Sequence, residues 1–144
     1  MRRLSLLVLL TLLGAPTRAH AQRAHLLVIT GLRGEASYGT AFAVLRGGIN
    51  HFQLPASWDL VHPFAVLPVE DWPAGLPRPE ARGNVTVVGE LCTPEDTLAR
   101  DVRVERVRAG DVVVFPLAGA YGWEFAMPNF LGRPPAWRAV ADGS

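Results

Sequence analysis

Glycine and proline recur along this sequence at intervals too short for long helices. The 144 residues include 12 prolines and 14 glycines, which separate short apolar segments along the whole chain. Proline fixes φ and removes a backbone donor, and glycine favours turns, so closely spaced copies of both end regular elements early. This punctuation favours many short strands joined by turns over long helices.

Apolar and β-branched runs mark the expected strands. These are His25–Thr30, Ala41–Leu45, Pro63–Val69, Asn84–Gly89, Asp101–Val107 and Val112–Phe115. The first two predict a hairpin, the two prolines of 63–69 predict a short or edge strand, 101–107 predicts a half-exposed strand, and 112–115 a buried one. Residues 71–83 are expected to form a loop. Helical turns are expected only at Ala56–Val61 and Pro94–Ala99. The sum is an all-β fold, a Greek-key barrel or sandwich of about seven short strands.

Length and composition indicate one globular domain. Hydrophobic residues make up 49% of the chain and charged residues 19%, which suits a packed core rather than disorder. The net charge of +1 comes without a basic run, so nucleic acid is not an expected partner. The single cysteine, Cys92, excludes an internal disulfide and a cysteine-rich zinc site. We expect no metal at His51 and His62, because no third ligand is grouped with them, and interpret them as histidines bonded to the backbone.

The first 22 residues differ from the rest. Met1–Arg3 is basic, Leu4–Leu13 is an almost unbroken apolar run, and small residues surround Ala21. This layout is typical of a secretory signal peptide, and the run is too short to span a bilayer. A truncated reading frame that begins with an apolar stretch would give the same pattern. We therefore treat residues 1–22 as a signal-like segment, expected to be a short apolar helix, and residues 23–144 as the folded domain.

Five motifs occur in order along the folded domain. They are Phe42–His51 with its Gly-Gly-Ile-Asn turn, Val88–Asp96 around the cysteine, Leu98–Asp101, Ala109–Asp111 and Gly119–Gly122. In this order and spacing they resemble the C-terminal β-domain of the fold-type III pyridoxal-phosphate decarboxylases, the group of the ornithine, diaminopimelate and arginine decarboxylases. The resemblance covers residues 36–141. It implies a cytoplasmic, homodimeric enzyme that decarboxylates a small amino acid with pyridoxal phosphate.

The resemblance also implies roles around the cysteine. Cys92 would donate the proton that replaces the lost carboxylate, a step suited to a thiol that ionises near neutral pH. Asp96 would face the substrate's distal amine through a charge-assisted hydrogen bond, and Thr93 would belong to the same substrate site. Without the motif, Cys92 would be interpreted as a small buried hydrophobic residue and Asp96 as an acid that caps a helix.

A second set of roles concerns the cofactor. Tyr121 would reach the phosphate of pyridoxal phosphate with its hydroxyl, and Gly119 and Gly122 would let the backbone turn closely beside it. Without the flanking glycines, Tyr121 would be interpreted as ordinary barrel packing with its hydroxyl in water.

Departures from the family pattern bear on the substrate. Diaminopimelate decarboxylases carry an arginine and then a tyrosine where this sequence has Leu54 and Trp58, and an acid where it has Thr93. Glu90 stands where proline is usual. These losses argue against diaminopimelate itself. The motifs around Cys92 and His51 resemble instead the secondary-metabolism branch, whose members act on siderophore or antibiotic precursors, or on amino acids tethered to carrier proteins.

The sequence contains no lysine, because all 14 basic residues are arginines. The family's β/α barrel carries the lysine that binds pyridoxal phosphate, so this chain would supply half of an active site and would not act alone. Three explanations stay open: a fragment of a longer enzyme or a degraded gene, one half of a split enzyme completed by a barrel-bearing partner subunit, and a non-catalytic exported β-domain that acts as a binding module. None of them places the chain in a membrane once the N-terminal segment is removed.

Overall fold

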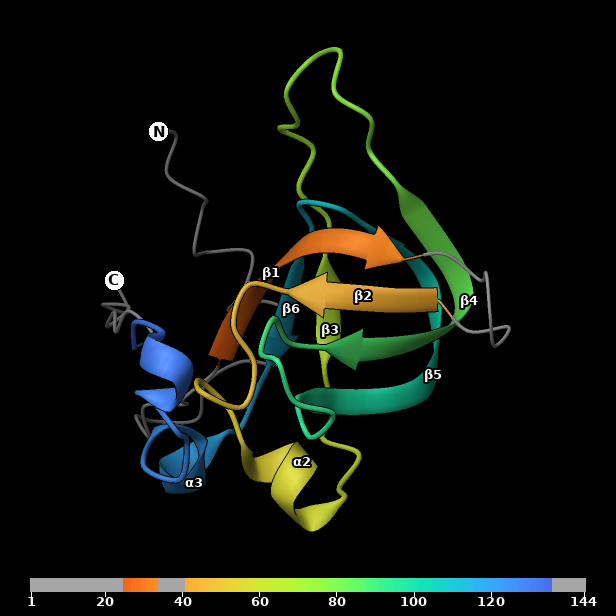
Figure 1. Cartoon of the computed structure of the whole chain (residues 1–144). Helices are drawn as coiled ribbons and strands as arrows, with labels where there is room; N and C mark the ends of the chain where they lie inside the picture. The colour runs from red at the N-terminus through yellow and green to blue at the C-terminus, as the bar shows by residue number, and fades with distance from the viewer. Residues whose placement is uncertain (1–24, 34–40, 136–144) are drawn as a thin grey trace, which may run out of the picture.

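The computed structural model describes residues 25–33 and 41–135, which form one curved sheet with three short helical segments. The elements in chain order are β1 His25–Arg33, β2 Ala41–Leu45, α2 Leu54–Trp58, β3 Ala65–Leu67, β4 Glu80–Val88, β5 Thr97–Arg108, β6 Val112–Phe115, α3 Gly119–Trp123 and the 3₁₀ turn η1 Phe130–Gly132. The sheet curls into a nearly closed barrel, which confirms the all-β class (Figure 1). The signal-like segment and its expected helix lie outside the described residues.

The strands follow one another in the order β3-β6-β1-β2-β4-β5. The first half of β1 pairs with β6 and its second half pairs with β2, with a register shift between Ile29 and Gly31. Because the two halves of β1 pair with different strands, the sheet bends at the register shift and curves toward closure. The antiparallel β1–β2 pair confirms the predicted pairing of these segments. β2 and β4 are parallel, and the other neighbouring strands are antiparallel.

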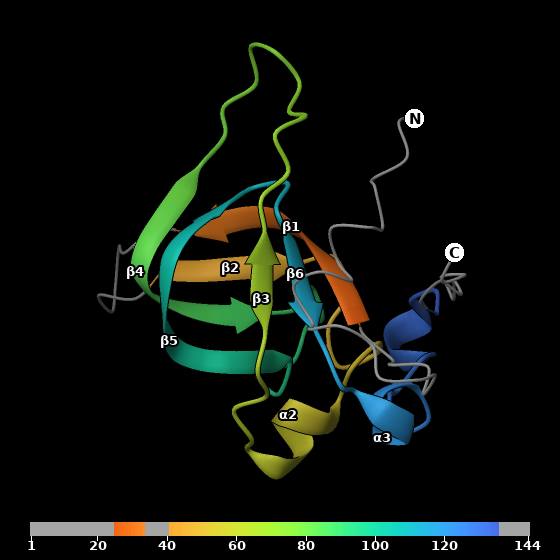
Figure 2. The same ribbon diagram turned by 180° about the vertical axis from the view of Figure 1, so that it is seen from behind.

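The two edge strands, β3 and β5, are not paired with each other, and Figure 2 shows them from behind. Residues 61–64, 66 and 102–106 line an open groove between them, which we call the seam. β3 is only three residues long and lies between Pro63 and Pro68, which confirms the short strand predicted from these two prolines. The barrel therefore stays open at the seam, and backbone hydrogen bonds join its strands elsewhere.

Alternate side chains of the strands fill the barrel. In β2 the buried positions are the first, third and fifth, and all four residues of β6 are buried, as predicted for Val112–Phe115. In β5, residues 101–105 alternate between exposed charge and half-buried valine, as predicted. The most deeply buried apolar side chains, each at most 1% exposed, are Ile29, Ala43, Leu45, Phe52, Val85, Leu98, Val113 and Phe115.

Several predicted boundaries were wrong. Pro94–Ala99 is not a helix, because the chain turns at Pro94 and Glu95 and enters β5 at Thr97. Residues 80–83, predicted as loop, begin β4 and pair with the end of β5. The helical turn predicted at Ala56–Val61 forms earlier, as α2. The short helix α3 was not predicted, and the described residues contain six strands rather than about seven.

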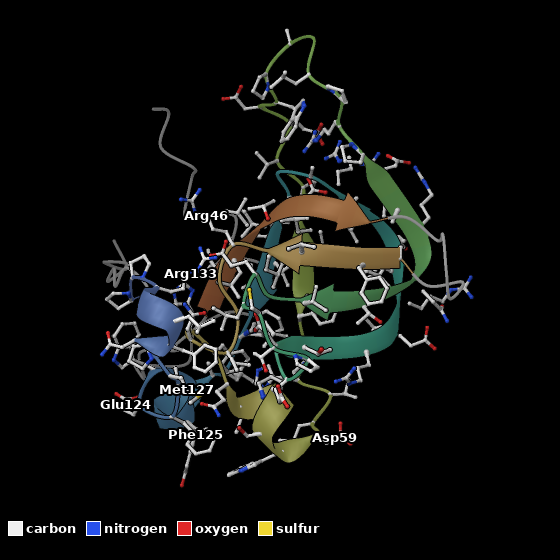
Figure 3. All side chains as sticks on the ribbon, viewed as in Figure 1. Arg46, Asp59, Glu124, Phe125, Met127 and Arg133 are labelled. Carbon is white, nitrogen blue, oxygen red and sulfur yellow. The ribbon has the colours of Figure 1, made fainter. Side chains whose placement is uncertain are left out.

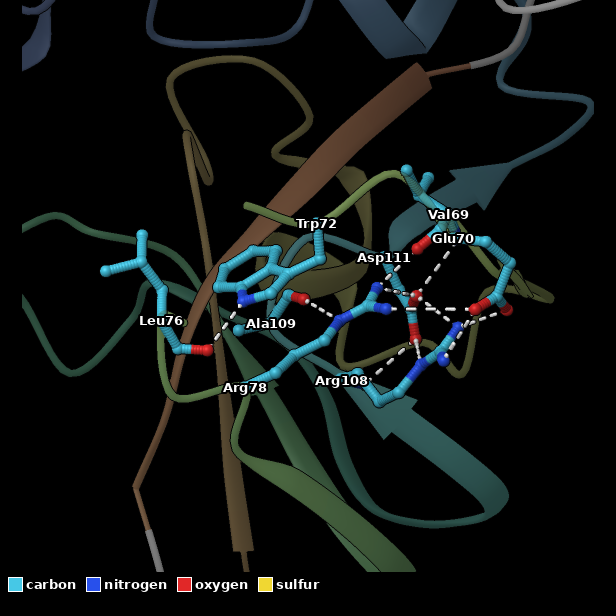
Figure 4. A network of polar contacts seen from close by, with 8 residues as sticks. All are labelled: Val69, Glu70, Trp72, Leu76, Arg78, Arg108, Ala109 and Asp111. Carbon is cyan, nitrogen blue, oxygen red and sulfur yellow. Dashed lines mark hydrogen bonds and ion pairs between the residues drawn. The ribbon is translucent and has the colours of Figure 1, made fainter. Parts of the chain in front are cut away.

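The long connection between β3 and β4 projects from the barrel (Figure 1), and charged side chains fix its base (Figure 4). Asp111, 1% exposed, accepts hydrogen bonds from the Val69 amide at 3.1 Å and the Arg108 amide at 2.9 Å. It also accepts from the guanidinium groups of Arg78 at 3.0 Å and Arg108 at 3.2 Å. Glu70 pairs with Arg108 at 2.8 Å from the exposed side. One buried carboxylate thus joins the projecting connection to the β5–β6 turn.

Arg78 extends this network to an aromatic ring. Its Nε donates to the Ala109 carbonyl at 2.9 Å, and its guanidinium lies 5.2 Å from the centre of the Trp72 ring. The Trp72 ring packs against Gly110, where a Cβ would lie 2.7 Å from the ring carbons. The base of the projecting connection is therefore packed as well as charged.

Candidate functional site

Cys92 lies on the connection between β4 and β5, residues 89–96, which we call the Cys92 loop. The Gly89 amide donates to the Asp96 carbonyl at 2.9 Å, and the Asp96 amide donates to the Thr93 carbonyl at 3.1 Å, so the loop is closed by its own backbone. Cys92 is a free, exposed thiol, and Thr93 is half-buried. The Thr93 hydroxyl donates to the exposed Glu95 carboxylate, which lowers the pKa of Glu95. The loop thus presents the thiol outward.

Residues 47–52 form a tight turn after β2, which we call the Gly-Gly turn. The amides of His51 and Phe52 both donate to the Gly48 carbonyl, at 2.8 and 2.9 Å. Gly47 has φ +109°, and a Cβ there would lie 2.1 Å from His51 Nδ1, so both the conformation and the space require glycine. Phe52 is fully buried and anchors the turn in the barrel core.

Asp96 joins the Cys92 loop to the Gly-Gly turn. Its Oδ1 accepts a hydrogen bond from the Ile49 amide at 2.7 Å, and its Oδ2 accepts one from the Leu91 amide at 2.8 Å. The residue is 2% exposed. Each oxygen thus accepts one backbone hydrogen bond, and the carboxylate is buried between the two segments. The substrate-facing role expected for Asp96 stays a prediction.

Burial raises the pKa of Asp96 above its ordinary value. The amides of Leu91 and Ile49 act in the opposite direction, because they stabilise the charged form, and their effect is smaller than that of burial. The Glu90 carboxylate raises the pKa of Asp96 further, and His51 lowers it.

This raised pKa predicts how stability changes with pH. The folded protein binds a proton at Asp96 more readily than the unfolded chain does, so the contribution of Asp96 to the free energy of unfolding is fully present below about pH 4 and is lost as pH rises through the raised pKa. We expect the stability of the wild type relative to Asp96→Asn to fall with rising pH in this window, measured by urea unfolding at a series of pH values.

The control is Glu95→Gln on the same loop. Because the pKa of Glu95 is lowered, its contribution has the opposite sign: it is present above the ordinary glutamate pKa and is lost as pH falls. A wild-type advantage over Asp96→Asn that grows with pH would contradict the assignment of a raised pKa to Asp96.

Tyr121 lies on α3 in an exposed aromatic cluster with Trp58 of α2 and Phe125. The ring centres of Tyr121 and Trp58 are 5.6 Å apart, those of Tyr121 and Phe125 6.1 Å, and those of Trp58 and Phe125 6.0 Å. Tyr121 is 57% exposed, and Gly119 has φ +58° at the start of the helix. Gly122 is buried. Figure 3 shows Phe125 at the outside of the α3 region. Sequence reasoning missed Phe125, since no motif marked it.

The segment that follows α3 contacts both the Gly-Gly turn and the Cys92 loop. The Met127 amide donates to the Ile49 carbonyl at 3.3 Å, and His51 Nε2 lies 3.2 Å from the Pro134 carbonyl oxygen. Arg133, labelled in Figure 3, pairs with Glu90 at 3.6 Å. Glu90, the departure from the usual proline, therefore binds a residue of this segment.

The histidines contact the backbone, as the sequence predicted. His62 Nε2 lies 2.7 Å from the Pro116 carbonyl oxygen, and His51 contacts Pro134 as given above. Across residues 25–33 and 41–135, no three histidine, cysteine or acidic side chains gather as a metal site. The same residues include no helix long and apolar enough to cross a bilayer.

The predicted site residues form two groups. Cys92, Thr93 and Asp96 belong to the Cys92 loop, whereas Tyr121 belongs to the aromatic cluster. Both groups lie on the side of the barrel away from the tip of the projecting connection (Figures 1 and 2). No hydrogen bond or ring contact joins Cys92 to Tyr121 within the described parts of the chain. The arrangement offers one exposed thiol on a fixed loop and one exposed phenol on a short helix.

Comparison with known proteins gives the family of this fold. The sequence profile of the family described as "Pyridoxal-dependent decarboxylase, C-terminal sheet domain" matches residues 21–119. A Staphylococcus aureus protein, 2-[(L-alanin-3-ylcarbamoyl)methyl]-2-hydroxybutanedioate decarboxylase, is 43% identical over 98 residues, which cover 67% of this chain and 24% of that protein. The L-glutamyl-[BtrI acyl-carrier protein] decarboxylase of Niallia circulans is 36% identical over 104 residues, 69% of this chain and 23% of that protein.

A solved structure shows the same fold. Diaminopimelate decarboxylase from M. jannaschii, in complex with L-lysine, superposes with a TM-score of 0.61 at 24% identity, covering 77% of this chain and 23% of that one. At this identity the likeness concerns the fold alone. The chain spans about a quarter of the length of these relatives.

Proposed function

Because this chain belongs to the family of pyridoxal-dependent decarboxylase C-terminal sheet domains, we propose that it supplies the Cys92 side of an amino-acid decarboxylase active site. The observation that supports this most directly is the exposed Cys92 thiol on a loop fixed at both ends. A proton donor that serves a second domain must be accessible and must also be held in place. The Cys92 loop meets both conditions.

Pyridoxal phosphate fits this chain only as a shared cofactor. The sequence has no lysine to bind it covalently, so that lysine must come from another domain or subunit. When bound, the cofactor would draw electrons from the carbon that loses carbon dioxide. Tyr121 is the residue here that we assign to its phosphate, because its hydroxyl is on an exposed side chain beside the left-handed turn at Gly119. Gly122, the next residue on α3, is buried.

Cys92 is the residue that we assign to proton transfer. Its thiol would donate a proton to the substrate carbon from which the carboxylate has left. Thr93, next to it on the same loop, would contact the substrate near that carbon. Asp96, expected from the motif at the substrate's distal amine, is buried here, and each of its oxygens accepts one backbone hydrogen bond.

The substrate that we propose is an amino acid within a larger molecule, of the kind made in secondary metabolism. Two observations support this class. Trp58 is half-exposed beside Tyr121, and by the family resemblance it stands where diaminopimelate decarboxylases would bind a distal carboxylate. The S. aureus relative is named for an alanine unit joined to a hydroxy acid, and the N. circulans relative for a glutamyl carrier protein.

The partner that we propose is a barrel-bearing domain or subunit in a dimeric enzyme, with a cytoplasmic location. The matched relatives are about four times as long as the region they share with this chain. The exported binding module, which the signal-like residues 1–22 support, remains the alternative.

A cofactor titration tests the proposal. The full chain is mixed with pyridoxal phosphate, alone and with the barrel domain of the S. aureus relative. We expect the visible absorbance of lysine-bound cofactor only with the barrel present. Decarboxylation of that relative's substrate should then fall by about 10²-fold to 10⁴-fold in Cys92→Ala, the usual contribution of a positioned proton donor.

Arg103→Ala, a change on the exposed face of β5, is the control and should retain activity. If the barrel domain gains no activity from this chain, the binding module becomes the better account. If it does and Cys92→Ala remains as active as Arg103→Ala, the role of Cys92 is wrong.

A further inference from the structure

We propose that Asp96 is a positioning residue for Cys92: its carboxylate clamps the Cys92 loop to the Gly-Gly turn and so fixes the place of the thiol. The proposal rests on the proposed function in one respect: that function gives the Cys92 thiol its reaction. The clamp itself is a property of this chain and can be tested without cofactor or partner.

Strand pairing brings together the two segments that Asp96 joins. β2 and β4 run parallel, with Val44 opposite Val88, so their carboxyl ends leave the sheet at the same place. The Gly-Gly turn follows β2 and the Cys92 loop follows β4. Backbone hydrogen bonds of the sheet end at this point, so the two segments need another contact to stay in register.

The Asp96 carboxylate provides that contact. It accepts from Ile49 of the Gly-Gly turn at 2.7 Å and from Leu91 of the Cys92 loop at 2.8 Å. Both distances are in the range of charge-assisted hydrogen bonds, which are about twice as strong as neutral ones. Leu91 is buried and immediately precedes Cys92, so fixing its amide fixes the backbone that carries the thiol.

Two glycines make room for the carboxylate. A Cβ at Gly48 would lie 1.9 Å from Asp96 Oδ1, and a Cβ at Gly89 would lie 2.1 Å from Oδ2. Gly48 belongs to the Gly-Gly turn and Gly89 begins the Cys92 loop. The carboxylate therefore lies between the two backbones, and both have the small residue that allows their close approach.

The charges around the clamp come from the same two segments and from the one packed on them. Glu90 and His51 face Asp96 with opposite effects on its charge. Arg133 pairs with Glu90 from the C-terminal segment. Substitution of Glu90 should therefore change the pH at which the clamp titrates while leaving the clamp itself in place.

The single cysteine makes a direct test available. A trifluoromethyl tag on Cys92 of the full chain gives one ¹⁹F resonance that reports the position of the loop, and ¹⁵N spectra follow the Ile49 and Leu91 amides. We expect Asp96→Asn to shift or broaden the ¹⁹F resonance and to speed hydrogen exchange at both amides by about tenfold or more, since each loses a bond to a charged acceptor. Glu95→Gln should leave all three signals unchanged.

A titration of the wild type provides a second readout that needs no variant to fold. The Ile49 and Leu91 amide shifts and the Cys92 tag should share one midpoint, and Glu90→Gln should move that midpoint to lower pH. A role in stability alone would appear as a lower melting temperature in Asp96→Asn with the tag resonance and both exchange rates unchanged, and it would overturn the proposal. So would a tag that does not follow the two amides. Neither result bears on whether Cys92 serves a decarboxylase, which the barrel experiment decides.

Discussion

Replacement of Asp111 by alanine is expected to lower the free energy of unfolding by about 3–5 kcal/mol, the range for removal of one partner from a buried ion pair. Asp111 is 1% exposed and accepts hydrogen bonds from two backbone amides and two guanidinium groups. Without it, Arg78 and Arg108, whose side chains are only 15% and 10% exposed, lose their buried counter-charge. Urea unfolding followed by circular dichroism measures the loss.

Glu70→Ala is the matched control for Asp111. Glu70 contacts the same two arginines, but its side chain is 72% exposed. Its hydrogen bond to Arg108, at 2.8 Å, raises the pKa of Arg108, but water screens this exposed pair. We expect a much smaller loss of stability than for Asp111→Ala. Equal losses in the two variants would contradict the buried position of the Asp111 carboxylate.

Alanine at Gly48 or Gly89 is expected to destabilise the protein by about 2–4 kcal/mol, from overpacking together with the loss of a hydrogen bond to a charged group. The new methyl group would lie 1.9 or 2.1 Å from an oxygen of Asp96, which is far inside contact distance. Asp96 cannot move aside without breaking its bond to Ile49 or Leu91. Thermal unfolding of both variants measures the effect.

Gly31→Ala is the control for these two glycines. Nothing lies within 4 Å of a Cβ at Gly31, and its φ is outside the left-handed region. The change should leave stability nearly unaffected or raise it slightly, because alanine restricts the unfolded chain. If Gly48→Ala is as stable as Gly31→Ala, the Asp96 carboxylate does not lie between the two backbones.

The strands were predicted well where burial alone decides them. Both β2 and β6 are apolar. Thr40 and Arg46 flank β2, and Asp111 and Pro116 flank β6, so the predicted limits agree with the structure. The start of β4 was missed because Glu80, Arg82 and Gly83 look like a loop. They form a strand because β5 is long enough to pair with them, and this partner lies too far along the sequence for a local pattern to reveal.

The false helix at 94–99 has a specific cause. Thr93, Pro94 and Glu95 have the residue types of a helix start, and Asp96 has that of a first-turn acid. The tertiary structure uses Asp96 otherwise, because its carboxylate satisfies amides of two other segments. Thr97 then begins β5 and pairs with Val88 of β4. Local preference was overruled by hydrogen bonds across the fold.

The sequence motifs indicate candidate residues but not their geometry. The motif around Cys92 points to the β4–β5 connection, where the thiol is exposed. It gives no direction for the Asp96 side chain, which is buried between two backbone segments. The aromatic cluster depends on the proximity of α2 and α3, where Trp58 and Tyr121 meet although 62 residues separate them in the sequence.

The seam between β3 and β5 affects how this domain behaves among its own copies. An unpaired strand edge can add a strand from another molecule, which is a route to aggregation. On β5 the exposed charges of Arg103, Glu105 and Arg106 face solvent, and Asp101 interrupts the strand with φ +49°. β3 is short and lies between prolines. Both edges therefore disfavour the addition of a strand from another molecule. The seam is thus protected against self-association, although the domain exposes the aromatic rings of Trp58 and Tyr121 elsewhere.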